Sequence, residues 1–207
     1  MPEIINIPAT LYQEKTALKA DLRAEVLEKR KGLTNELIKS YSQSIGEWLL
    51  SILPEKPIYI HLFLPMAKNH EVDLRGLLPV LWERGDTVYI PRVTIDQKLE
   101  HVQLTPGTII EKNRWGIPEP AKHHLPATKE EIKAIEIVLT PLLVCDQQGF
   151  RVGYGGGFYD QFFQDYPHVQ KIGVGFFEPI TEILDIYEGD IPLDLYISPS
   201  RITRFNQ

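Results

Sequence analysis

Apolar residues recur at helical spacing through the first quarter of the chain. Between residues 14 and 31 they fall every three or four positions, which predicts an amphipathic helix. Gly32 ends that pattern, and Thr34 belongs to the residue types that cap helix N-termini. The same spacing then continues as far as Ile52, so a second helix is expected to follow Thr34.

Strand-like apolar runs come next, separated by short helical patterns. The runs typical of strands are residues 57–65, 86–93, 99–104, 135–144 and 171–177. The helical patterns cover residues 71–84, 129–133 and 158–166, and Pro79 is expected to kink the first of them. A Pro-rich loop is expected over residues 113–128.

The alternation of strands with helices favours an α/β fold with a largely parallel sheet. Ligands of such sheets bind beyond the carboxyl ends of the strands. The chain has neither an internal repeat nor a stretch with the composition of a linker. We therefore expect residues 1–207 to form one domain, with residues 1–13 as a loosely ordered lead.

Composition narrows the classes of function. The net charge of −6 argues against broad nucleic-acid binding, although local charge decides whether a phosphate can bind. No apolar run is long enough for a membrane span, and the N-terminus lacks the pattern of a signal peptide. The single cysteine, Cys145, excludes an internal disulfide. These features predict a cytoplasmic protein that acts without membrane or nucleic acid.

The stretch RVGYGGGFYD, residues 151–160, contains four glycines in ten residues. It fits neither common phosphate motif, because GxGxxG needs glycine where Phe158 stands and a P-loop needs Gly-Lys-Ser/Thr. A tight turn needs only one or two glycines, whereas each further glycine costs roughly 0.5–1 kcal/mol against alanine. The following helix also directs its N-terminal amides toward this loop. The loop therefore indicates an anion site.

Charged residues elsewhere offer partners for such an anion. Lys15, Lys19 and Arg23 recur every four residues, so they are expected on one face of the first helix. That stripe is either a solvated face or a phosphate contact. Asp160 is either a first-turn helix acid or a magnesium ligand. Asp190 would ordinarily be a turn residue.

Three further candidates carry less information. Glu71 would ordinarily be an acid at a helix N-terminus. Trp115, in a loop, is either a packing plug or a platform for a flat ligand. The adjacent His123 and His124 point in different directions on a strand or helix, and the histidines form no metal-binding pattern.

Taken together, the basic N-terminal KADLR, the loop RWGIPEP and a strand leading into RVGYGGGFYD resemble the 5-formyltetrahydrofolate cyclo-ligases, also called methenyltetrahydrofolate synthetases. The glycine motif is highly specific to that family. The resemblance covers nearly the whole chain and implies a three-layer α/β/α fold around a mostly parallel sheet. It also implies ATP- and Mg²⁺-dependent conversion of 5-formyltetrahydrofolate to 5,10-methenyltetrahydrofolate, with release of ADP and phosphate. Separately, we expect the chain to act as a monomer.

The resemblance also implies site residues. The nucleotide site would comprise Lys19, Arg23, Arg151, Gly153, Tyr154, Gly155, Gly156, Gly157, Phe158 and Tyr159, of which Lys19, Arg23 and Tyr154 are the expected catalytic residues. Magnesium would be held by Asp160 and Asp190. The folate pocket would comprise Met66, Glu71, Trp115, Tyr154, Gly156 and Phe158.

Two positions depart from the family pattern. The family usually reads Tyr-Tyr-Asp-Arg where this chain has Phe158, Tyr159, Asp160 and Gln161, so a phenol and a guanidinium are missing. Two other classes stay open on the sequence: a nucleotide- or RNA-binding module on the same fold, and an ATP-dependent enzyme with another second substrate. The intact Asp160 and the acidic balance count against the first, and Glu71 and Trp115 against the second.

Overall fold

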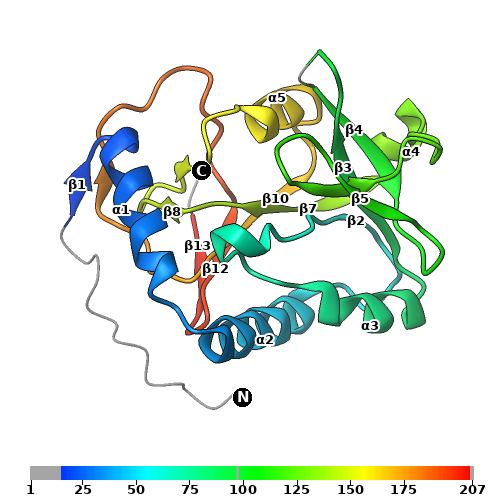
Figure 1. Ribbon diagram of the computed structural model, residues 1–207, viewed down its shortest axis with the longest axis horizontal. Coiled ribbons are helices and arrows are strands. Elements are labelled where there is room, and N and C mark those ends of the chain that lie inside the picture. Colours follow the sequence, from blue (N-terminus) through cyan, green and yellow to red (C-terminus); the bar gives the residue numbers. More distant parts are fainter. Residues whose placement is uncertain (1–14, 97, 206–207) are drawn as a thin grey trace.

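A computed structural model describes residues 15–96 and 98–205 (Figure 1). At its centre is a seven-stranded sheet with the strand order β13-β12-β10-β7-β2-β3-β4. The five inner strands are parallel, and the edge strands β13 and β4 pair antiparallel with their neighbours. The strands are β2 (Tyr59–His61), β3 (Thr87–Val93), β4 (Leu99–Gln103), β7 (Ile135–Pro141), β10 (Gln170–Val174), β12 (Leu195–Ile197) and β13 (Ile202–Arg204). The predicted, mostly parallel sheet is confirmed.

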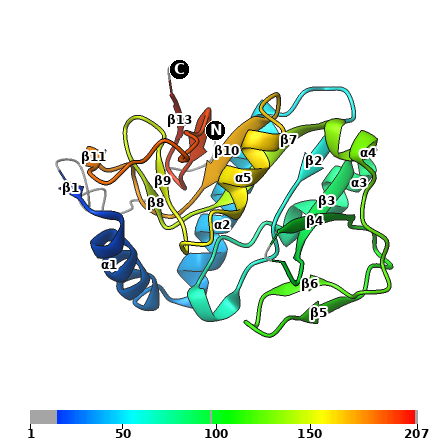
Figure 2. The same ribbon diagram turned by 90° about the horizontal axis from the view of Figure 1, so that it is seen from above.

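Helices cover both faces of this sheet, which confirms the three-layer architecture (Figures 1 and 2). One face packs against α2 and α3, and apolar side chains of α1 join the same core. The other face packs against α5, through Phe162 and Phe163, and against Ile132 of α4. The helices are α1 (Lys19–Lys31), α2 (Asn35–Ile52), α3 (Leu78–Glu83), α4 (Lys129–Lys133) and α5 (Phe158–Asp165), with short 3₁₀ turns η1 (Ala67–Asn69) and η2 (Arg75–Leu77).

Local capping explains where two of these helices begin. The Thr34 hydroxyl accepts a hydrogen bond from the Leu37 amide, as its predicted capping role requires. At α4, Thr128 and Glu131 form a capping box. Both helices therefore begin where the sequence pattern places them.

Three short strand pairs lie outside the central sheet. They are β1 (Thr16–Ala17) with β11 (Glu182–Ile183), β5 (Ile110–Lys112) with β6 (Pro118–Pro120), and β8 (Val144–Cys145) with β9 (Arg151–Val152). The buried Asp146 organises the turn of the last pair by accepting the amides of Gln148 and Phe150. This hairpin returns the chain to the carboxyl edge of β7, where the glycine loop begins.

The first helix is shorter than predicted. Residues 15–18 are not helical, because Thr16 and Ala17 pair with β11 instead. The helix begins at Lys19, whose amide donates to the Asp185 carboxylate at 2.7 Å. Residues 1–14, including the predicted lead, lie outside the described residues.

The helix predicted over residues 71–84 is also wrong in its first half. Residues 71–74 are not helical, and α3 begins only at Leu78. Pro79 lies in the first turn of α3, where a missing amide costs nothing, so no kink forms. The predicted strand 135–144 ends at Pro141, and the Pro-rich loop contains β6. One domain for the whole chain stays a prediction. None of the helices described here has the length and apolar character to cross a bilayer.

Candidate active site

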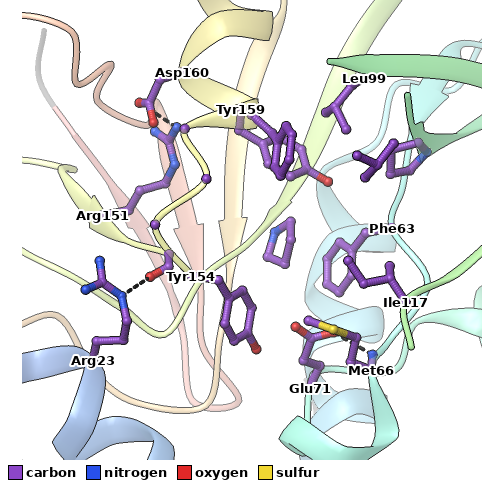
Figure 3. Close-up of a pocket in the computed structure, with 18 of the residues that line it drawn as sticks. Arg23, Phe63, Met66, Glu71, Leu99, Ile117, Arg151, Tyr154, Tyr159 and Asp160 are labelled. Carbon is purple, nitrogen blue, oxygen red and sulfur yellow. Dashed lines mark hydrogen bonds and ion pairs between the residues drawn. The ribbon is translucent and has the colours of Figure 1, made fainter. Parts of the chain in front are cut away.

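A cavity of about 480 Å³ opens at the carboxyl edge of the parallel sheet (Figure 3). The glycine loop separates it into two compartments. Arg23, Arg151 and Asp160 lie on one side, whereas Phe63, Ile117 and Glu71 lie on the other (Figure 3). The predicted residues that line it are Lys19, Arg23, Met66, Glu71, Arg151, Gly153, Tyr154, Gly155, Gly156, Gly157, Phe158, Tyr159, Asp160 and Asp190. The structure thus brings together all the predicted site residues except Trp115.

The glycines of the loop serve different purposes. Gly155 and Gly157 have φ values of 98° and 66°, a region that disfavours residues with a Cβ atom. Gly157 is also the N-cap of α5, so the free amides of that helix begin at the loop. Gly153 and Gly156 lack this backbone requirement. A Cβ on Gly156 would lie within 2.6 Å of the Phe158 ring, whereas a Cβ on Gly153 would meet nothing within 4 Å.

Two cations of α1 reach the loop. The Arg23 Nε donates to the Gly153 carbonyl at 2.9 Å, so the guanidinium is fixed beside the glycines (Figure 3). Lys19 forms an ion pair with Asp190 in which both side chains are largely buried. The predicted third member, Lys15, precedes the helix and pairs with Glu25, so the expected stripe on one helix face is wrong for Lys15.

The two predicted magnesium ligands also hold protein partners. Asp160 Oδ1 accepts from Arg151 Nη2 at 2.7 Å and from the Ile191 amide at 3.0 Å. Asp190 Oδ2 accepts from Lys19 and from the Tyr187 amide. The second oxygen of each carboxylate makes no hydrogen bond to any of the residues described.

These carboxylates fit a magnesium ion only in part. Within residues 15–96 and 98–205, no three His, Cys, Asp or Glu side chains come together as a metal site. Mg²⁺ commonly binds one or two carboxylates together with phosphate oxygens and water. The free oxygens of Asp160 and Asp190 therefore suit a magnesium ion that arrives with a nucleotide. They supply too few ligands to hold such an ion without one.

Glu71 lies across the cavity from these charges. It is not a helix-start acid, because the residues that follow it are not helical. The residue is only 5% exposed, and its carboxylate accepts a hydrogen bond from the Met66 amide at 2.6 Å. Burial raises the pKa of this carboxyl, while the Met66 amide, the Tyr154 phenol and the Arg30 charge act in the opposite direction. Glu71 is therefore a buried acid in a largely apolar compartment.

The apolar wall of that compartment is the part of the site that sequence reasoning missed. Its members come from four separate segments and include Phe63, Leu64, Pro91, Val93, Leu99, Ile117 and Pro118. Only Ile117 and Pro118 belong to a motif that the sequence singles out, RWGIPEP, so only these two could have been found from the sequence. Tyr187, whose ring is 59% exposed, also lines the cavity, with Lys19 Nζ 4.8 Å from its ring centroid. Its proximity to Asp190 in the chain was the available clue.

Trp115 does not line the cavity. Its ring is 41% exposed, which excludes a packing plug, and the Arg114 guanidinium lies 4.1 Å from the ring centroid. Lys68 donates to its carbonyl at 2.8 Å, so the loop is tied to η1. A contact between Trp115 and a ligand stays a prediction.

The fold and the site define an α/β protein whose glycine loop divides one cavity into a charged compartment and an apolar compartment. Residues 15–194 match the model of the 5-formyltetrahydrofolate cyclo-ligase family. This chain therefore belongs to that family.

Individual relatives agree with this assignment. The chain is 28% identical to the 5-formyltetrahydrofolate cyclo-ligase of Escherichia coli strain K12, over 86% of this chain and 98% of that one. It is 27% identical to the enzyme of the same name from Haemophilus influenzae, over 86% and 96% of the two chains. Among solved structures, the Aquifex aeolicus 5,10-methenyltetrahydrofolate synthetase aligns with a TM-score of 0.72 at 25% identity, over 92% and 94%. The Mycoplasma pneumoniae synthetase, at 21% identity and a TM-score of 0.66, supports the fold.

Proposed function

We propose that this chain catalyses the ATP- and Mg²⁺-dependent conversion of 5-formyltetrahydrofolate to 5,10-methenyltetrahydrofolate, with release of ADP and phosphate. One observation carries the proposal beyond family membership. A loop of bare backbone separates two compartments of one cavity, one with Lys19, Arg23 and Arg151, the other apolar with Glu71. A nucleotide and a flat, mostly apolar second substrate would thus meet at the loop.

In this chemistry the γ-phosphoryl group of ATP is transferred to the oxygen of the N-formyl group, which becomes a good leaving group. The neighbouring folate nitrogen then attacks the formyl carbon, loses its proton, and expels phosphate as the five-membered ring closes. Phosphoryl transfer requires mainly positioning and charge neutralisation. The chain supplies both: Lys19, Arg23 and the loop amides for the phosphates, and the apolar wall for the folate.

Glu71 would orient the pterin. A carboxylate can accept two hydrogen bonds from the N–H edge of a pterin ring, and such charge-assisted bonds are strongest away from water. The burial of Glu71 supports this role. Tyr187 offers an exposed ring on which the nucleoside base can stack, beside the cation that would meet the phosphates.

Magnesium would be held by the free oxygens of Asp160 and Asp190, and when bound it neutralises phosphate charge. Lys19 and Arg151, which pair with these carboxylates, would then take phosphate oxygens as partners instead. The chain has a single cysteine and therefore no internal disulfide, which is compatible with the reducing, cytoplasmic setting that we propose.

The direct test combines pure protein with 5-formyltetrahydrofolate, ATP and Mg²⁺ and follows the absorbance of the methenyl product. Product should form only when ATP and a divalent ion are both present. Full-rate product formation in excess chelator would contradict the proposal. ATP binding without product would favour a nucleotide-binding module, and ATP hydrolysis with no methenyl product would favour a different second substrate.

A further inference from the structure

A buried arginine stands behind the site and is not used by the mechanism above. Arg30, in the last turn of α1, is only 2% exposed. It forms no ion pair with any described carboxylate, and its Nε has no hydrogen-bond partner there. Burying a charge without compensation is expensive, so its surroundings should explain its retention.

The contacts of Arg30 lead to the cavity. Its Nη1 donates to the Tyr154 hydroxyl at 3.3 Å, and its Nη2 donates to the Leu142 carbonyl. Tyr154 lines the cavity, and its phenol points toward Glu71 (Figure 3). The charge of Arg30 acts on Glu71 as well, and the Tyr154 phenol interacts with the same carboxylate. Arg30, Tyr154 and Glu71 thus form one chain of polar groups.

We propose that Arg30 is a positioning residue for folate binding: through Tyr154 it aims the phenol at Glu71 and keeps that carboxylate ionised when the folate excludes water. This inference rests on the proposed function. A purely structural Arg30 would instead tie the end of α1 to the Leu142 carbonyl and to the Phe176 ring, whose centroid lies 5.8 Å from the guanidinium carbon.

Other groups also face Glu71, and their effects on its carboxylate must be distinguished from the effect of Arg30. Tyr159 of α5 is partly buried with its phenol oxygen inaccessible to water, and this burial, together with the nearby charge of Glu71, raises its pKa, so the phenol stays neutral at all pH values of interest. His70 precedes Glu71, and its Nδ1 lies 2.6 Å from the Arg30 carbonyl oxygen. Asn69 contributes a hydrogen-bonding group near Tyr154 but no charge.

The sign of the effect follows from these charges. A positive charge near a carboxyl lowers its pKa, so loss of Arg30 raises the pH at which Glu71 becomes protonated. If only the ionised carboxylate binds the pterin, folate affinity falls at low pH as Glu71 becomes protonated. Loss of Arg30 then moves this fall, the acidic limb of the affinity–pH curve, to higher pH. At pH values below the inflection, each tenfold gain in the proton affinity of Glu71 lowers folate affinity about tenfold.

The experiment measures 5-formyltetrahydrofolate binding by calorimetry between about pH 5 and 8, without ATP or Mg²⁺. Arg30→Met should move the acidic limb upward, and Tyr154→Phe should move it in the same direction. Arg30→Lys keeps the charge and should leave the limb near its wild-type position. In a Glu71→Gln background, Arg30→Met should cause no further shift.

Two controls complete the design. Arg92→Met removes another buried arginine, which binds Glu100 and the Ala121 carbonyl and does not line the cavity, so it should leave the limb unchanged. His70→Asn suits the left-handed backbone at that position, removes the imidazole next to Glu71, and should also leave the limb unchanged.

An unmoved limb in Arg30→Met, or a shift that persists in Glu71→Gln, overturns the inference. If Arg30→Met does not fold, the other two variants test the inference. It then requires that the limb shifts in Tyr154→Phe and stays in place in Arg30→Lys, and any other result overturns it. Wild-type protein that does not bind 5-formyltetrahydrofolate would overturn the proposed function itself, whereas wild-type binding with an unmoved limb overturns the role of Arg30 alone.

Discussion

Replacing Asp160 with asparagine tests whether this carboxylate serves stability, metal binding or both. The asparagine oxygen can still accept from both Arg151 and the Ile191 amide, but the negative charge that faces the Arg151 guanidinium is lost. The side chains of Arg151 and Asp160 are 7% and 19% exposed, so water compensates poorly for the lost charge. Hydrogen bonds to charged groups contribute about 1.5–3 kcal/mol net, which sets the scale of the loss. At roughly 2–4 °C per kcal/mol for a chain of this size, Asp160→Asn should melt about 3–12 °C lower without ligand.

The same variant should need more magnesium. Loss of an outer-shell partner of a metal typically costs about 10–100-fold in affinity, and a direct ligand should cost at least the lower figure. The half-saturating Mg²⁺ concentration of the ATP-dependent reaction should therefore rise at least about tenfold. Asp165→Asn, an exposed acid of the same helix, is the matched control and should change neither quantity.

Each outcome has a distinct meaning. A lower melting temperature with wild-type Mg²⁺ dependence would make Asp160 a structural partner of Arg151 only. Unchanged melting with impaired Mg²⁺ dependence would mean that the ion pair seen here contributes nothing to stability. If neither quantity changes, the reasoning from this ion pair and from the free oxygen is refuted.

Three further predictions follow from the site. Gly157→Ala should lower the free energy of unfolding by roughly 1 kcal/mol because Gly157 has a left-handed backbone. Gly153→Ala should melt like the wild type, and it should raise the KM for ATP if a phosphate occupies the open space beside Gly153. Thermal melts and ATP titrations of both variants check these outcomes. Glu71→Gln should weaken folate binding about 10- to 100-fold, with ATP affinity unchanged in separate titrations. Tyr187→Ala should weaken ATP binding but not tripolyphosphate binding, since only ATP has a base to stack; Leu184→Ala, at a similarly exposed residue outside the cavity, is the control.

The sequence predicted the parts of the site that local chemistry determines. Successive glycines after a buried strand placed a candidate anion site here, and the loop does line the cavity, while anion binding itself stays a prediction. Thr34 as a cap and the strand 86–93 needed only local patterns as well. These features depend on residues close together in the chain, which is why a single sequence is sufficient to predict them.

Features that depend on tertiary contacts could not be predicted in this way. Arg30 lies in the basic last turn of a helix, which from sequence is typical of solvated residues, and only packing against the β7–β8 connection buries it. Glu71 precedes an apolar pattern that suggested a helix start, but the chain continues without helical structure there, and Met66 supplies its partner. Lys15 fitted a helical repeat and is removed from it by pairing with β11.

The charges of the cavity explain why the nucleotide and the metal should bind together. Lys19 pairs with Asp190 and Arg151 pairs with Asp160, so these four charges cancel and Arg23 leaves the compartment with a net positive charge. A triphosphate alone would draw the two cations away and leave both carboxylates unpaired beside further negative charge. A magnesium ion alone would face two carboxylates already committed to cations. The two ligands together satisfy both sets, because the phosphates take the cations while the metal takes the carboxylates. If magnesium binds as proposed, we expect the arrangement to favour the magnesium–nucleotide complex over either component, since ion pairs this far from water are costly to break singly.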